Sequence, residues 1–219
     1  MKRFLCYIIF GLLVNSSSVY LYANNPQQEA QEILSGKLSS ENFRYITFEK
    51  VLTLMKERNV KTIVETGTTR GVLLQDIFAG DGGGTILFSE YALRNDARVY
   101  SVDILQEAFE NAAHFLTPYE GFIFTVCDDS VNFIKNFNST IDMLYLDSYD
   151  FDINDPSPSQ VHHLNEIIAA YPLLTSRSIV MIDDCGLPWG GKGALAIQYL
   201  QEQGWKTLIQ AYQVILIKE

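Results

Sequence analysis

The 219-residue chain carries 26 acidic and 16 basic side chains, which gives it a net charge of −10. Hydrophobic residues make up 47% of it and charged residues 19%, a balance typical of a folded globular protein and not of a disordered one. The acidic charge and the lack of a basic stripe argue against a nucleic-acid partner, because affinity for phosphates depends on clustered Lys and Arg. This length is enough for one substantial core with a short extension.

The first 23 residues resemble a secretory signal peptide. Lys2 and Arg3 precede the apolar run Phe4–Val14, and Ala23 offers a small residue for cleavage. An uncleaved anchor is the alternative, although the run is shorter than the roughly 20 apolar residues that span a bilayer. We therefore expect the protein to be exported or tethered to the membrane by this segment. If the segment is uncleaved, it is the only part that we expect to contact the membrane.

Residues 24–60 predict two amphipathic helices, at 26–33 and 40–58, which carry no chemical motif. We expect them to form a helical cap that packs on the main sheet of residues 61–219.

From residue 61 onward, strand and helix patterns alternate. Apolar strands that alternate with helices predict a mostly parallel sheet covered on both faces, here a Rossmann-like α/β three-layer sandwich. The last two strands have no helix between them, so we expect an antiparallel C-terminal hairpin. The predicted strands lie at 62–65, 98–103, 122–126, 141–146, 177–183, 205–210 and 212–217, and the predicted helices at 71–79, 85–95, 105–116, 129–137, 159–171 and 191–203.

The segment 61–71, KTIVETGTTRG, predicts a buried strand, a glycine turn and the start of a helix. Gly67 and Gly71 bracket the turn, where a glycine lets the backbone approach a ligand closely. Glu65 ends the strand, and we expect it to accept hydrogen bonds from a ligand hydroxyl or amine. An acid at this place would repel a pyrophosphate, so a ligand with ribose hydroxyls or an ammonium group fits better.

Acidic residues also end the next four strands. Because ligands of open α/β sheets bind at the carboxyl ends of the strands, this recurrence predicts one ligand site lined with carboxylates. Asp103 is placed to hold both hydroxyls of a ribose, with helix capping as the alternative. The other acids are Asp128 and Asp129 after the third strand, Asp147 after the fourth, and Asp183 and Asp184 after the fifth.

The order of ETGTTRG, VYSVDI, CDDS, IDMLYLD and IVMIDD resembles the class I S-adenosylmethionine-dependent methyltransferases over roughly residues 60 to 219. The resemblance implies a seven-stranded sheet with a reversed last strand and S-adenosylmethionine as cofactor. It also implies roles for individual residues. Glu65, Gly67, Thr68 and Gly71 would belong to the cofactor loop, Asp103 would bind the ribose, and Asp129 with Ser130 would contact the adenine.

A narrower resemblance, to catechol-type O-methyltransferases, concerns Asp147, Asp183 and Asp184. It implies that these carboxylates bind Mg²⁺ or another divalent cation, which would lower the pKa of an acceptor hydroxyl. The alternative is that the aspartates cap loops. The lysine base of those enzymes is missing here, so the expected catalytic residues are Asp147, a histidine of the pair His162 and His163, with His163 chosen, and Lys192.

The leading interpretation is therefore methyl transfer to a small-molecule acceptor, at oxygen, assisted by a divalent cation. Export would separate such an enzyme from its cytosolic cofactor, which keeps a second interpretation open. That alternative is a non-methylating relative, either a module that binds a nucleoside-like ligand or a metal-dependent oxygenase of the cephalosporin hydroxylase-like group, which the strand-end aspartates also resemble.

Overall fold

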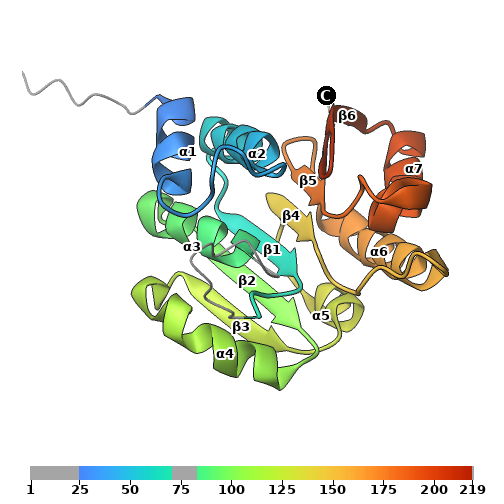
Figure 1. Cartoon of the computed structure of the whole chain (residues 1–219), viewed down its shortest axis with the longest axis horizontal. Coiled ribbons are helices and arrows are strands. Elements are labelled where there is room, and N and C mark those ends of the chain that lie inside the picture. The colour runs from blue at the N-terminus through green and yellow to red at the C-terminus, as the bar shows by residue number, and fades with distance from the viewer. Residues whose placement is uncertain (1–24, 71–82, 219) are drawn as a thin grey trace, which may run out of the picture.

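The computed structural model describes residues 25–70 and 83–218, and its centre is a seven-stranded sheet (Figure 1). Each strand is a short run rich in β-branched, aliphatic or aromatic residues, which suit a pleated and buried surface. The strands are β1 Thr62–Thr66, β2 Arg98–Asp103, β3 Ile123–Cys127, β4 Met143–Leu146, β5 Ile179–Ile182, β6 Lys206–Gln210 and β7 Val214–Ile217.

The strands follow the order β3-β2-β1-β4-β5-β7-β6. The pairs among β1 to β5 are parallel, whereas β7 runs antiparallel to both β5 and β6. The predicted Rossmann-like sheet with an antiparallel C-terminal hairpin is confirmed. β1 and β4 are parallel neighbours at the point where the strand order changes direction, and open α/β sheets bind ligands in the crevice outside the carboxyl ends of such strands.

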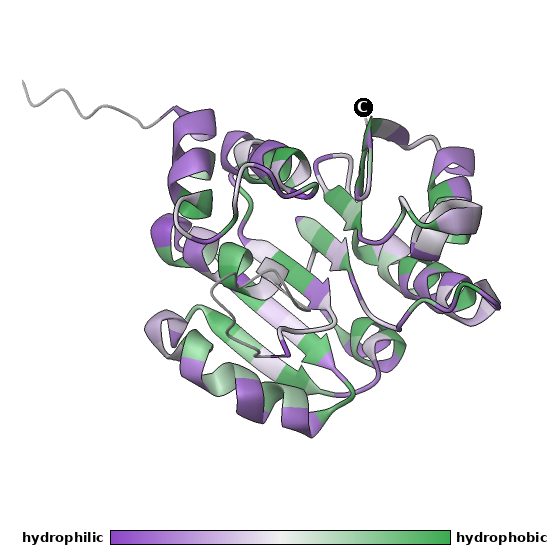
Figure 2. Ribbon diagram, viewed as in Figure 1, coloured by the Kyte–Doolittle hydropathy of each residue, from purple (hydrophilic) through white to green (hydrophobic). Residues whose placement is uncertain are grey.

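Helices cover both faces of the sheet (Figures 1 and 2). The residues of β1, β4 and β5 alternate between two apolar clusters, one on each face. Ile63 and Met181 belong to the cluster beneath α1, α2 and α3, whereas Val64 and Ile182 belong to the one beneath α5, α6 and α7. The helices are α1 Pro26–Leu34, α2 Tyr45–Arg58, α3 Gly83–Asn95, α4 Gln106–Leu116, α5 Ser130–Asn136, α6 Ser157–Ala170 and α7 Ala194–Glu202, with 3₁₀ turns η1 Thr117–Tyr119, η2 Tyr171–Leu173 and η3 Pro188–Gly193.

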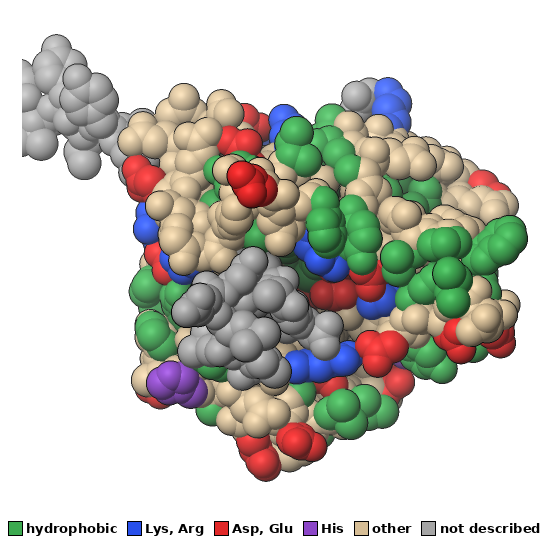
Figure 3. All heavy atoms as spheres, viewed as in Figure 1, with side chains coloured by type: hydrophobic (Ala, Val, Ile, Leu, Met, Phe, Trp, Pro, Cys, Tyr) green, Lys and Arg blue, Asp and Glu red, His purple; other side chains and the backbone are tan. Residues whose placement is uncertain are grey.

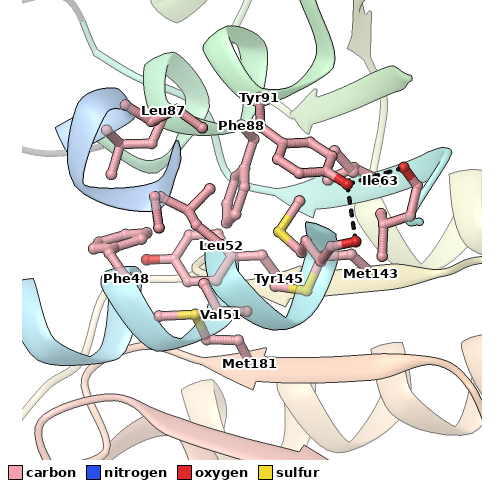
Figure 4. Close-up of a cluster of buried hydrophobic side chains, with 14 of the residues drawn as sticks. Phe48, Val51, Leu52, Ile63, Leu87, Phe88, Tyr91, Met143, Tyr145 and Met181 are labelled. Atoms are coloured by element: carbon pink, nitrogen blue, oxygen red, sulfur yellow. Dashed lines mark hydrogen bonds between the residues drawn. The ribbon is translucent and has the colours of Figure 1, made fainter. Parts of the chain in front are cut away.

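The N-terminal helices share the first cluster with the sheet (Figure 4). Phe48 of α2 packs against Phe88 of α3 and Tyr145 of β4, with ring centroids 6.1 and 6.0 Å away. The Tyr91 hydroxyl donates to the carbonyls of Met55 and Val60, at 2.9 and 3.3 Å. These contacts fix α2 over the sheet, which brings the residues just before α2 to the edge where the parallel strands end.

The starts of four helices, α2, α3, α6 and α7, differ from the prediction by two residues or more. Residues 40–44 form turns, not helix, because Asn42 Oδ1 accepts the backbone N–H of Arg44 at 2.9 Å and α2 starts only at Tyr45. The helix expected at 85–95 begins two residues earlier, at Gly83. A Cβ at Gly84 would lie 2.9 Å from the Tyr145 ring, so this glycine allows α3 to pack closely on β4.

The expected segment 1–23, the helix at 71–79 and Gly71 lie outside the described residues. In the described part of the chain, no helix has the length and apolar character required to cross a bilayer.

Candidate functional site

A cleft of about 1030 Å³ opens at the carboxyl ends of the parallel strands. Figure 3 shows acidic and basic side chains gathered in the hollow at the middle of this face. The structure brings most of the predicted site residues together here. Those that line the cleft are Gly67, Thr68, Asp103, Asp129, Ser130, Asp147, Asp183, Asp184 and Lys192.

The turn after β1 is held against the neighbouring strands. Gly67 has φ +87°, and its N–H donates to the Val102 carbonyl at 2.7 Å. A Cβ at this position would lie 2.7 Å from the backbone oxygen of Asp147. Glycine is therefore required both by the left-handed conformation and by the close approach of the end of β4.

Glu65 lies beneath this turn and does not line the cleft, contrary to its expected place at the ligand. It shares a strand face with Ile63, so its carboxylate points toward α3, and it accepts a hydrogen bond from Ser101 Oγ of the neighbouring strand β2 at 2.8 Å. Burial raises the pKa of Glu65 to about 8, with the Ser101 and Thr85 hydroxyls acting in the opposite direction. Glu65 therefore supports the floor of the cleft in its protonated form at neutral pH.

Asp103 lies at the end of β2 and lines the cleft next to aliphatic side chains. Its Oδ1 accepts the backbone N–H of Leu105 at 2.9 Å, so one carboxylate oxygen fixes the turn that follows the strand. Val102, Ile104 and Leu105 line the cleft next to it, and Ile104 and Leu105 are largely exposed. A carboxylate beside exposed aliphatic side chains suits the hydroxyls and ring of a nucleoside.

Asp129 and Ser130 begin α5, where both side chains already have partners. Asp129 caps the helix by accepting the N–H of Asn132 at 2.8 Å. Ser130 Oγ donates to Glu166 Oε1 at 2.5 Å and lies 3.0 Å from His162 Nε2. Asp129 therefore caps α5, and the Ser130 hydroxyl is held by α6.

The structure selects the other histidine of the predicted pair. His163 is fully buried, its Nδ1 lies 2.8 Å from the Ser159 carbonyl, and it does not line the cleft, so the choice of His163 as base is wrong. His162 lines the cleft, and hydrogen bonding to Glu166 raises its pKa. Adjacent helix residues face different directions, so only one of the two histidines can meet a ligand.

Two cations cross-link the aspartates that end β4 and β5. Arg44 Nε lies 3.1 Å from both oxygens of Asp183, and its Nη2 lies 3.2 Å from Asp184 Oδ1. Lys192 Nζ lies 2.9 Å from Asp184 Oδ2 and 3.3 Å from Asp147 Oδ1. Three carboxylates thus share two fixed positive charges.

The protonation states of this cluster follow from burial and neighbouring charges. Burial, together with the charge of Asp183, raises the pKa of Asp147 well above its ordinary value. Burial opposes ionisation of Asp184 and Lys192 as well, but their attraction to each other lowers the pKa of Asp184 and helps to raise that of Lys192. Asp147 is therefore the carboxylate of the cluster that can take up a proton.

No family model and no curated protein matches the sequence, but solved structures match its fold. A Staphylococcus aureus protein described as a caffeoyl-CoA O-methyltransferase aligns over 90% of this chain and 93% of its own, with 15% identity and a TM-score of 0.56. A methyltransferase of Podospora anserina with bound S-adenosylhomocysteine aligns over 81% and 80%, with 11% identity and a TM-score of 0.58. This chain has the class I methyltransferase fold.

A third methyltransferase-fold neighbour, MycE of the mycinamycin biosynthetic pathway, was solved with Mg, S-adenosylhomocysteine and mycinamycin VI. It aligns over 89% of this chain and 54% of its own, with 14% identity and a TM-score of 0.56. The metal expected here at Asp147, Asp183 and Asp184 does not fit the arrangement of this chain. Arg44 and Lys192 engage those carboxylates, and the described residues contain no group of His, Cys, Asp and Glu side chains arranged to hold a metal ion.

Phe43, Arg44 and Tyr212 are among the residues that sequence reasoning missed in the cleft of this methyltransferase fold. Arg44 and its neighbour Phe43 precede α2 in the predicted cap, where no motif marks them. Tyr212 lies in the β6–β7 hairpin and donates to Asp184 Oδ1 at 2.5 Å. Only the three-dimensional packing of these distant segments brings them to the ends of β4 and β5.

Proposed function

We propose that the chain is an S-adenosylmethionine-dependent methyltransferase that acts on a hydroxyl group of a small-molecule acceptor. The observation that carries this proposal is the shared cleft that Asp103 and the Gly67 turn line at adjacent strand ends. The fold of the solved methyltransferases supports it.

The cofactor half of the cleft fits a nucleoside with a positively charged tail. Gly67 lines the cleft with its backbone, Asp103 supplies a carboxylate for ribose hydroxyls, and Leu105 supplies an apolar surface for a ring. A cleft of about 1030 Å³ is large enough for this ligand together with a small acceptor. When bound, S-adenosylmethionine supplies an activated methyl group on a sulfonium sulfur.

The acceptor half lies at the charged cluster. Asp147 is the residue we assign to receive the proton of the acceptor hydroxyl, because burial raises its pKa and Lys192 holds one of its oxygens. Phe43, Tyr149 and Phe151 line the same cleft and offer an apolar surface for the body of the acceptor. No step in this assignment needs a divalent cation.

The location of the protein is part of the proposal. Lys2, Arg3 and the apolar run Phe4–Val14 favour export or tethering. Because S-adenosylmethionine is a cytosolic metabolite, this segment keeps one second function in view, the binding of a nucleoside-like ligand in the same cleft without methyl transfer. Both functions require nucleoside binding, so only an assay of methyl transfer distinguishes them.

Calorimetry of the full-length protein with S-adenosylhomocysteine tests the proposal. We expect a single binding event, and we expect Asp103→Ala to weaken it by about 10- to 100-fold, as for the loss of hydrogen bonds to a charged group. Asp155→Ala is the matched control, because Asp155 makes the same type of turn, accepting the Ser157 N–H at 3.2 Å, but lies outside the cleft. Absence of binding by the wild-type protein would refute the proposed cofactor.

A further inference from the structure

The carboxylate oxygens of Asp147, Asp183 and Asp184 nearly all accept hydrogen bonds or form ion pairs within the protein. Asp183 Oδ1 accepts from Arg44 Nε and from the Asp184 N–H, at 3.1 and 2.8 Å, and Asp183 Oδ2 accepts from Arg44 Nε and Tyr145 Oη, at 3.1 and 3.0 Å. Asp184 receives Arg44 and Tyr212 on one oxygen and Lys192 on the other. Within the described residues, only Asp147 Oδ2 has no such partner.

Arg44 is fixed in place by more than its ion pairs. Its guanidinium carbon lies 4.8 Å from the ring centroid of Phe43 and 4.5 Å from that of Tyr212, and the two rings lie 4.4 Å apart. Cation–π contacts of this kind hold a guanidinium over the faces of the rings. Arg44 therefore cannot leave the aspartates without giving up both ring contacts.

Lys192 is fixed by the backbone of η3. Its side chain is buried, and its N–H donates to the Asp184 carbonyl at 3.3 Å. Gly190 and Gly191 next to it have φ +81° and +58°, a path that an L side chain rarely follows. The loop therefore delivers the ammonium group to the gap between Asp147 and Asp184 and keeps it there.

We propose that Arg44 and Lys192 form a built-in replacement for the divalent cation of this carboxylate cluster, so that the site binds no metal. A hard divalent cation needs about six oxygen ligands at 2.0–2.6 Å, whereas all but one of these carboxylate oxygens already receive N–H or O–H donors. Two positive charges about 3 Å from the same oxygens would also repel such an ion strongly.

Arg44 and Lys192 also have N–H groups that can donate hydrogen bonds to the molecule to be methylated, an inference that rests on the proposed function. Nη1 of Arg44 has no hydrogen-bond partner in residues 25–70 and 83–218, and Arg44 lines the cleft. Lys192 has three N–H groups and two carboxylate partners. Both residues thus have an N–H left for an acceptor oxygen that becomes negative as it loses its proton.

Binding of Mn²⁺ alone, measured by electron paramagnetic resonance of the free ion with the full-length protein, tests the metal-free site. We expect wild type to bind no more Mn²⁺ than Asp183→Asn does. Arg44→Gln combined with Lys192→Gln leaves the carboxylates without counter-charge, and it should increase Mn²⁺ affinity at least tenfold. Arg44→Lys combined with Lys192→Arg keeps both charges and is the matched control, for which we expect no gain.

Two results would overturn the inference. One is Mn²⁺ binding by wild type that Asp183→Asn abolishes; the other is a folded Arg44→Gln/Lys192→Gln protein with no gain in affinity. If that double variant does not fold, the comparison of wild type with Asp183→Asn decides alone. Because Mn²⁺ is the only probe, failure to bind S-adenosylhomocysteine would refute the proposed function without affecting this result.

Discussion

Gly191→Ala is expected to abolish the proposed methyl transfer and to lower the melting temperature by about 6–12 °C. Gly191 has φ +58° and ψ −152°, a region that is essentially restricted to glycine. A Cβ there would lie 1.7 Å from the Asp184 carbonyl oxygen, a contact that only a backbone shift can relieve. A cost of at least ~3 kcal/mol follows from this strain and clash together, and about 2–4 °C per kcal/mol applies to a chain of this size.

The loss of activity follows from the position of Lys192, the next residue. Any shift of the Gly191 backbone moves the ammonium group away from Asp147 and Asp184, which lie 3.3 and 2.9 Å from it. Asp147 and Asp184, which are partly buried, would then lose the counter-charge of the buried Lys192, and breaking such a desolvated ion pair is destabilising.

Gly204→Ala provides the matched control for calorimetric melting and for the activity assay. Gly204 also has a positive φ, +83°, but a Cβ there would meet no atom within 4 Å. It follows α7 at a helix end far from the cleft lining. We expect Gly204→Ala to cost only about 1 kcal/mol and to keep activity. Equal effects of the two variants would show that φ alone, and not the approach to Asp184, makes glycine necessary.

The fold could be predicted from the sequence because its pattern is local. Runs such as VYSVD and IVMI are long enough in apolar and β-branched residues to mark strands, and the structure places β2 at the predicted bounds. The boundary of α2 could not be predicted, since the pattern of 40–58 is apolar at helical spacing whereas side-chain hydrogen bonds of Ser39 and Asn42 form turns before Tyr45.

Only part of the site could be predicted, from the rule that ligands of open α/β sheets bind at the carboxyl ends of the strands. That rule places Asp103, Asp147 and Asp183 at one edge of the sheet, and the structure puts all three in the cleft. It says nothing about what lies opposite them, because Arg44 is 139 residues before Asp183 in the chain. The sequence therefore predicts a metal ion at these carboxylates, whereas in the structure Arg44 and Lys192 provide the positive charge.

Strand alternation explains why Glu65 is not where its position at a strand end suggested. Successive side chains point to opposite faces of a sheet, so the last residues of a strand cannot all turn to the ligand. Glu65 follows Ile63 onto the α3 face, where Ser101 donates to it and a Cβ at Gly84 would lie 3.1 Å from its Oε1.

Glu65→Gln is expected to make the protein more stable than wild type at pH 8, by up to about 4 kcal/mol. The pKa of Glu65 is about 8 in the folded protein against an ordinary 4.5, so the folded state holds a proton that the unfolded state releases. This group therefore lowers the free energy of unfolding as the pH rises from about 4.5 to 8, at about 1.4 kcal/mol per pH unit. A glutamine amide has no proton to release, so the advantage of the variant should vanish toward pH 4.5.

Denaturant unfolding of wild type and Glu65→Gln across this pH range measures the free energy of unfolding of each protein. In the difference between the two, the contributions of the titrating groups that they share cancel. Glu110→Gln makes the same substitution on the exposed side of α4 and should leave the pH dependence unaltered. The affinity for S-adenosylhomocysteine decides where the Glu65 side chain acts. From its place beneath the cleft we expect Glu65→Gln to change that affinity less than about twofold, whereas a loss like that of Asp103→Ala would mean that Glu65 touches the ligand.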